Sequence, residues 1–104
     1  MEEWKNPILE LNGEEVAMDR YLINQQGAIK HFNASDVRLT YATITSFHHP
    51  YASIVFLHEG YLLQDFLHRI IWRSFKGGIP PTHDIFYVSF EHGYELSNLT
   101  MEEL

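Results

Sequence analysis

The chain has 104 residues, of which 45% are hydrophobic and 14% aromatic, and this content predicts one globular domain with a single core. Fourteen acidic residues against seven Lys and Arg give a formal net charge of -7, which disfavours nucleic-acid binding through the whole surface. The chain has no cysteine, so disulfides, thiol catalysis and cysteine-based zinc sites are excluded. No apolar run is long enough to span a membrane and the first residues are acidic, so we expect a cytoplasmic protein without a membrane partner.

Residues 1–36 are predicted to form a region of two β-hairpins. Asn12-Gly13 supplies the two positive φ angles of a type I′ turn between two strand-like segments. A second pair of such segments is joined by a loop that contains Gly27. The four strands are expected at residues 8–11, 14–18, 21–24 and 28–32.

Residues 37–104 are predicted to form a strand–helix core around a short antiparallel sheet. Its strands are expected at residues 37–47, 51–57 and 85–90. Between the last two, apolar residues recur at helical spacing and predict one central amphipathic helix over residues 61–76, which ends at the Gly-Gly and Pro-Pro pairs that follow. A short terminal helix is expected at residues 97–104. The chain is therefore assigned to the α+β class as a single domain.

The central helix carries the only concentrated basic stripe in the sequence. Its members are His68, Arg69, Trp72, Arg73 and Lys76. Spacings of three and four residues place them along one side of a helix, where an aromatic anchor among cations would suit phosphate or an acidic partner. The alternative is structural: Arg69 pairs with Asp65 one helical turn earlier, and Trp72 packs at the edge of the core.

Seven histidines in a chain without cysteine raise the question of a metal site. The adjacent pair His48-His49 is poorly arranged for chelation, and the other histidines show neither an i, i+4 pair nor the HExxH pattern. The sequence also lacks the glycine-rich and nucleophile motifs of nucleotide-binding proteins and hydrolases. We therefore expect neither a metal nor another cofactor.

Several short motifs resemble the phage-type HNH homing endonucleases. They are residues 2–5 (Glu-Glu-Trp-Lys), 21–24 (Tyr-Leu-Ile-Asn), 27–29 (Gly-Ala-Ile), 66–71 (Phe-Leu-His-Arg-Ile-Ile) and 96–100 (Leu-Ser-Asn-Leu-Thr). The resemblance touches both halves of the chain and implies that residues 1–104 form one HNH-like domain with a ββα-related scaffold. It also implies an ancestry in metal-dependent DNA cleavage.

The residues that carry catalysis in that family have no clear counterpart here. The resemblance implies an Asp-His pair and asparagines that bind the metal and activate water, whereas residues 85–95 of this chain are mostly aromatic and aliphatic. His83, Asp84 and Asn98 are the nearest substitutes, with the His-Asp pair in reversed order. A divalent metal is expected only if these residues form an active nuclease.

These observations favour a non-catalytic, acidic HNH-like binding protein, encoded by a phage, that inhibits a host defence or nucleic-acid-processing protein. An anti-CRISPR protein is one example of this kind. The carboxylates expected to face the protein partner are Glu2, Glu14, Glu15, Asp19, Glu91, Glu95 and Glu102. They would stand in for phosphates against Lys and Arg of the target.

Three alternatives stay open. The acidic ends can simply be solvated surface that keeps the protein soluble. The chain can be a DNA-binding module or a residual metal-dependent HNH endonuclease that uses the basic stripe of the helix. It can also be an unrelated enzyme in which His83 and Asp84 act within a cleft that sequence alone does not reveal.

Overall fold

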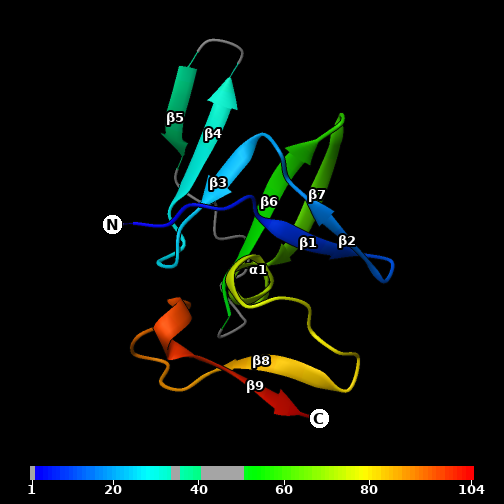
Figure 1. The fold of residues 1–104 in the computed structure, drawn as a ribbon, viewed down its shortest axis with the longest axis vertical. Helices are drawn as coiled ribbons and strands as arrows, with labels where there is room; N and C mark the ends of the chain where they lie inside the picture. The colour runs from blue at the N-terminus through cyan, green and yellow to red at the C-terminus, as the bar shows by residue number, and fades with distance from the viewer. Residues whose placement is uncertain (1, 34–35, 41–50) are drawn as a thin grey trace.

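The computed structural model describes residues 2–33, 36–40 and 51–104 (Figure 1). Its elements in chain order are β1 (Ile8–Leu11), β2 (Glu14–Ala17), β3 (Tyr21–Ile23), β4 (Ile29–Asn33), β5 (Asp36–Thr40), β6 (Ser53–His58), β7 (Tyr61–Phe66), α1 (Leu67–Phe75), β8 (His83–Tyr87), the 3-10 helix η1 (Leu96–Asn98) and β9 (Leu99–Glu103). The described residues therefore form a small mixed domain of short strands and one α-helix.

The strands form four small antiparallel sheets that surround α1 (Figure 1). Their orders are β1-β2, β3-β4-β5, β6-β7 and β8-β9. The pair β8-β9 lies on one side of the helix and the other three sheets lie on the opposite side. No helix among the described residues is long and apolar enough to cross a bilayer. The α+β class agrees with this arrangement.

Both predicted N-terminal hairpins are confirmed. Asn12 and Gly13 have φ angles of 52° and 85°, and they join β1 to β2 with Leu11 opposite Glu14. The second hairpin pairs β3 with β4. The predicted strand over residues 37–47 corresponds to β5 in its first part, and residues 41–47 lie outside the described part of the chain.

The predicted helix over residues 61–76 is wrong in its first six residues. Residues 61–66 form β7, which pairs with β6, and α1 begins at Leu67. The cause is the Glu59-Gly60 turn, whose φ angles of 50° and 82° return the chain directly onto the preceding strand. The cross-strand hydrogen bonds thus prevail over the helical spacing of the apolar residues.

The predicted C-terminal helix is also wrong. Only the three residues of η1 are helical, and β9 then pairs with β8 so that Ile85 faces Met101. Only Leu99, at the start of β9, is buried, and the exposure of the strand increases toward its C-terminal end. The strand predicted at residues 51–57 matches β6 within two residues, whereas that at residues 85–90 begins and ends earlier, as β8.

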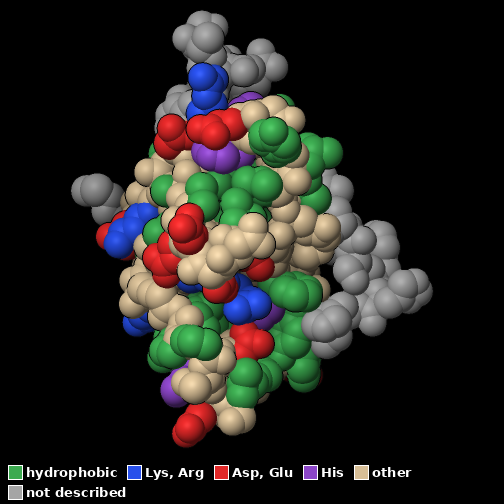
Figure 2. All heavy atoms as spheres, turned by 90° about the vertical axis from the view of Figure 1, so that its right-hand side faces the viewer, with side chains coloured by type: hydrophobic (Ala, Val, Ile, Leu, Met, Phe, Trp, Pro, Cys, Tyr) green, Lys and Arg blue, Asp and Glu red, His purple; other side chains and the backbone are tan. Residues whose placement is uncertain are grey.

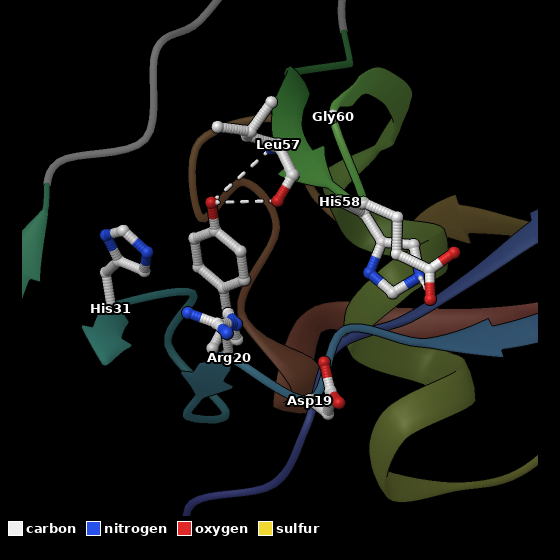
Figure 3. A pocket seen from close by; sticks show the side chains of 8 residues that line it. Asp19, Arg20, His31, Leu57, His58 and Gly60 are labelled. Carbon is white, nitrogen blue, oxygen red and sulfur yellow. Dashed lines mark hydrogen bonds and ion pairs between the residues drawn. The ribbon is translucent and has the colours of Figure 1, made fainter. Parts of the chain in front are cut away.

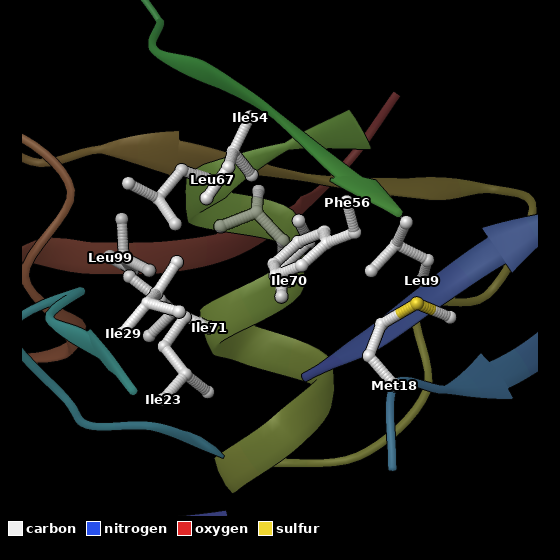
Figure 4. Close-up of a cluster of buried hydrophobic side chains, with 11 residues drawn as sticks. Leu9, Met18, Ile23, Ile29, Ile54, Phe56, Leu67, Ile70, Ile71 and Leu99 are labelled. Atoms are coloured by element: carbon white, nitrogen blue, oxygen red, sulfur yellow. The ribbon is translucent and has the colours of Figure 1, made fainter. Parts of the chain in front are cut away.

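The core lies where the sheets meet α1 (Figure 4). Its members are Leu9, Met18, Ile23, Ile29, Ile54, Phe56, Leu67, Ile70, Ile71, Ile85 and Leu99. Ile70 and Ile71 on the helix are fully buried. Because every sheet contributes at least one of these side chains, the helix is the common surface against which otherwise separate hairpins are stabilised.

We expect the substitution Gly27→Ala to lower the free energy of unfolding by about 1–2 kcal/mol more than Gly13→Ala does. Both glycines have a φ of 85°, so both substitutions introduce the same left-handed backbone strain. A Cβ at Gly27 would lie 2.6 Å from Cε2 of Tyr94, whereas one at Gly13 would meet nothing within 4 Å. Equal losses in chemical denaturation would contradict this packing effect.

Candidate functional site

Arg73 of the predicted basic stripe is inside the molecule. Its side chain is only 2% exposed, because α1 packs against β1 and β7 on this side. One guanidinium nitrogen donates to Oδ2 of Asp65 at 2.7 Å and another donates to Oε2 of Glu10 at 3.1 Å. The charge of Arg73 is therefore neutralised within the fold, and Arg73 is not part of a surface stripe.

Arg69 belongs to the same set of ion pairs. Its guanidinium lies 3.7 Å from Oε2 of Glu10 and 3.4 Å from Oδ1 of Asp84. The alternative pairing of Arg69 with Asp65 is wrong, since Asp65 lies in β7 and binds Arg73 instead. We call Glu10, Asp65, Arg69, Arg73 and Asp84 the ion-pair cluster. It joins β1, β7, α1 and β8.

His68, Trp72 and Lys76 lie in three different surroundings. The His68 ring is buried and stacks on Tyr51 at 4.4 Å between centroids, with Tyr87 edge-on at 5.6 Å. This burial lowers the pKa of His68 to about 4, so the ring is neutral at neutral pH. Trp72 packs against the core, as its structural alternative predicts, and Lys76 is exposed. The five residues therefore do not form one open binding face.

The nearest substitutes for a nuclease site are separated. The Nδ1 atom of His83 lies 2.8 Å from the hydroxyl of Thr82, and Asp84 accepts a hydrogen bond from its neighbour's backbone N–H. Asn98 lies at the other end of the β8-β9 hairpin, about 10 Å or more along the strand from Asp84. Within the described ranges, no three potential metal ligands come together.

Asn98 has a structural role instead. Its side-chain amide donates to the carbonyl oxygens of Ser89 and Gly93 at 2.7 Å each, and its carbonyl oxygen accepts from the backbone N–H of Ser89 at 3.0 Å. These three bonds fix the turn after β8. Asn98 is only 7% exposed, and its side-chain oxygen and nitrogen are engaged in these bonds rather than presented to solvent.

All the carboxylates predicted to face a partner are exposed. They are Glu2, Glu14, Glu15, Asp19, Glu91, Glu95 and Glu102. Figure 2 shows acidic side chains recurring along the length of one face, among hydrophobic ones. Glu2 accepts a hydrogen bond from the Asn24 side chain, which makes it less available than the rest.

Sequence reasoning missed a cleft of about 510 Å³ between the β3-β4 hairpin and the turn that follows β6 (Figure 3). Its lining residues are Asp19, Arg20, Tyr21, His31, Leu57, His58, Glu59 and Gly60. His31 and His58 lie on opposite sides, with Asp19 and Arg20 below them in this view. We call this the hairpin cleft. The segments that form it are more than twenty residues apart in the sequence.

Rings and a phenol hydroxyl hold the hairpin cleft together. Tyr21 and His31 face each other in the β3-β4 register, and their rings stack at 4.6 Å with 13° between planes. The Tyr21 hydroxyl lies 3.4 Å from both the backbone N and O of Leu57, which connects β3 with β6. The predicted second hairpin includes both Tyr21 and His31, but their pairing was not predicted and no sequence signal indicated that β6 lies beside them.

Comparison of the chain with family models, with curated proteins and with solved structures finds no match in any of the three. The resemblance to the HNH endonucleases rests on the short motifs alone and stays a prediction.

Proposed function

We propose that this chain is a non-catalytic, acidic binding protein that docks on a basic surface of another protein. The observation that carries this proposal is the ion-pair cluster. Arg69 and Arg73, the cations best placed by sequence to contact phosphate, are paired instead with Glu10, Asp65 and Asp84 of the same chain. The charges of these two arginines are neutralised by ion pairs within the fold, whereas many carboxylates remain at the surface.

The remaining surface charge supports a basic partner. Among the described residues, the exposed cations are Lys5, Arg20 and Lys76. The exposed carboxylates include Glu3, Glu59 and Glu103 in addition to the predicted set. A surface with this excess of one sign attracts a partner of the opposite sign and raises the rate of association.

The partner class that best fits is a nucleic-acid-binding protein, because its phosphate-contacting Arg and Lys would accept carboxylates in place of phosphate oxygens. The resemblance to phage-type HNH endonucleases supports a phage origin and hence an inhibitor of a host defence effector, as an anti-CRISPR protein is. Such an inhibitor would act in the cytoplasm of the host.

The test is a four-site variant with Glu14→Gln, Glu15→Gln, Glu95→Gln and Glu102→Gln. None of these side chains belongs to the ion-pair cluster, so the fold is expected to persist. For a protein partner captured from host lysate, we expect association at least about tenfold slower and a flatter dependence on salt. Duplex DNA should compete with the wild-type chain for that partner. The opposite change, Lys76→Gln, should speed association slightly.

Three results would contradict this proposal. An unchanged association rate in the four-site variant would show that the exposed carboxylates do not contact the partner. Nicking of duplex DNA with Mg2+, Mn2+ or Zn2+ that is lost on His83→Ala would favour a residual HNH endonuclease. Tight duplex binding by the chain itself, weakened by Lys76→Gln, would favour a DNA-binding module.

A further inference from the structure

We infer that the hairpin cleft receives an arginine side chain of the basic partner. This inference rests on the proposed function and specifies where the partner docks and with which chemical group. The cleft is hollow, lies at the surface and brings together two carboxylates, a ring stack and the apolar side chain of Leu57. A guanidinium is the group that all three features accommodate.

The carboxylates in the cleft are available to a ligand. Among the described residues, Asp19 is exposed and has no hydrogen-bond or ion-pair partner. Glu59 has a side chain that is 82% exposed, and its oxygen lies 4.0 Å from Nε2 of His58, too far for a hydrogen bond. The lining has two carboxylates, those of Asp19 and Glu59, against the one guanidinium of Arg20. This excess of carboxylates favours a cation over an anion.

The ring stack distinguishes a guanidinium from an ammonium. The stacked rings of Tyr21 and His31 belong to the cleft lining, and planar guanidinium groups stack on such rings better than ammonium groups do. Tyr21 is held in place by its contact with Leu57 and by the buried Phe56, whose ring lies edge-on at 4.8 Å. Because the rings are already fixed, little side-chain freedom is lost when a ligand binds.

An apolar rim continues from Leu57 in the cleft onto the β6-β7 hairpin. Leu57, Tyr61 and Leu62 of the β6-β7 hairpin are 57%, 72% and 75% exposed. Leu57 lines the cleft, and it faces Leu62 directly across the hairpin. Exposed apolar side chains around a polar contact exclude water once a partner covers them, which strengthens the contact. This rim therefore suits an arginine presented by a folded protein surface.

Phosphate is the competing ligand, since Arg20 and two histidines also line the cleft. Asp19 and Glu59 would repel it, and Arg20 would repel a guanidinium. The substitution Arg20→Gln therefore has opposite effects on the two ligands. It should tighten the binding of an arginine peptide about two- to threefold and weaken that of phosphate.

The first experiment titrates the chain with the blocked tripeptide Gly-Arg-Gly and follows its backbone amide resonances. We expect saturable shifts at Asp19, Leu57 and Gly60, and binding at least about fivefold weaker when the arginine is replaced by its neutral isostere citrulline. The double variant Asp19→Asn, Glu59→Gln should bind the arginine peptide more weakly than the wild type by a similar factor. Shifts at other residues only, or none, would overturn the inference, as would phosphate binding that Arg20→Gln abolishes.

The second experiment separates this inference from the proposed function. The affinity for the captured partner is measured for two double variants that remove the same charge. One is Asp19→Asn with Glu59→Gln, in the cleft, and the other is Glu14→Gln with Glu15→Gln, outside it. A loss at least about fivefold larger for the cleft pair supports the inference. Equal losses of affinity would support the acidic docking surface but contradict the assignment of the cleft. No loss of affinity in either variant would contradict both the cleft and the proposed function.

Discussion

Replacing Arg73 with alanine is expected to lower the free energy of unfolding by about 3–5 kcal/mol, because it leaves buried carboxylate charge without a partner. Asp65 has a side chain that is only 11% exposed, and it contacts Arg73 at 2.7 Å. Glu10 loses its shorter ion pair in the same variant, since Arg69 lies farther from it. Denaturant unfolding followed by circular dichroism measures the loss.

Arg69→Ala is the matched control for this prediction. Arg69 is on the same helix and in the same cluster, but its side chain is 27% exposed and its ion pairs are 3.4 Å and 3.7 Å long. We expect Arg69→Ala to lower the free energy of unfolding by about 1 kcal/mol, because partly exposed ion pairs contribute little to stability. The double variant Arg73→Met, Asp65→Leu should recover much of the Arg73→Ala loss, because apolar side chains of similar size replace a buried ion pair well. Equal losses for Arg73→Ala and Arg69→Ala would contradict the cluster's assigned role.

The fold could be predicted from the sequence where the signal was local. Asn12-Gly13 defines its hairpin because two consecutive positive φ angles suit very few other dipeptides. The start of α1 could not be predicted in this way, since the apolar spacing that predicts a helix extends N-terminally into β7. The deciding feature was the Glu59-Gly60 turn, in which glutamate is an unusual residue at positive φ.

The site could be predicted only in part, because most of its contacts join distant segments. The exposure of the predicted carboxylates followed from their charge, which is rarely buried without a partner. The burial of Arg73 could not be predicted from the sequence, because its partner Glu10 is 63 residues away. The hairpin cleft depends on how β3 and β6 pack against each other, and no periodicity within either strand specifies that arrangement.

Lowering the pH from 6.5 to 4 is expected to reduce the free energy of unfolding by roughly 3 kcal/mol through His68 alone. Burial lowers the pKa of this ring from 6.5 to about 4 in the folded chain, against a smaller opposing effect of Asp84. Above pH 6.5 the ring is neutral in both states, so its contribution to stability is fully present. Below pH 6.5 the unfolded chain takes up the proton while the folded chain does not, and stability falls until the pH reaches the folded pKa.

The variant His68→Phe isolates this effect, because phenylalanine keeps a ring beside Tyr51 and Tyr87 and does not titrate. We expect wild-type stability to fall about 2 kcal/mol more than that of the variant between pH 6.5 and 5, a range in which most carboxylates stay ionised. His92→Gln, at an exposed position, controls for the loss of an imidazole. Parallel stability curves for the wild type and His68→Phe, or a His68 resonance that titrates near pH 6.5, would show that the ring is accessible to water.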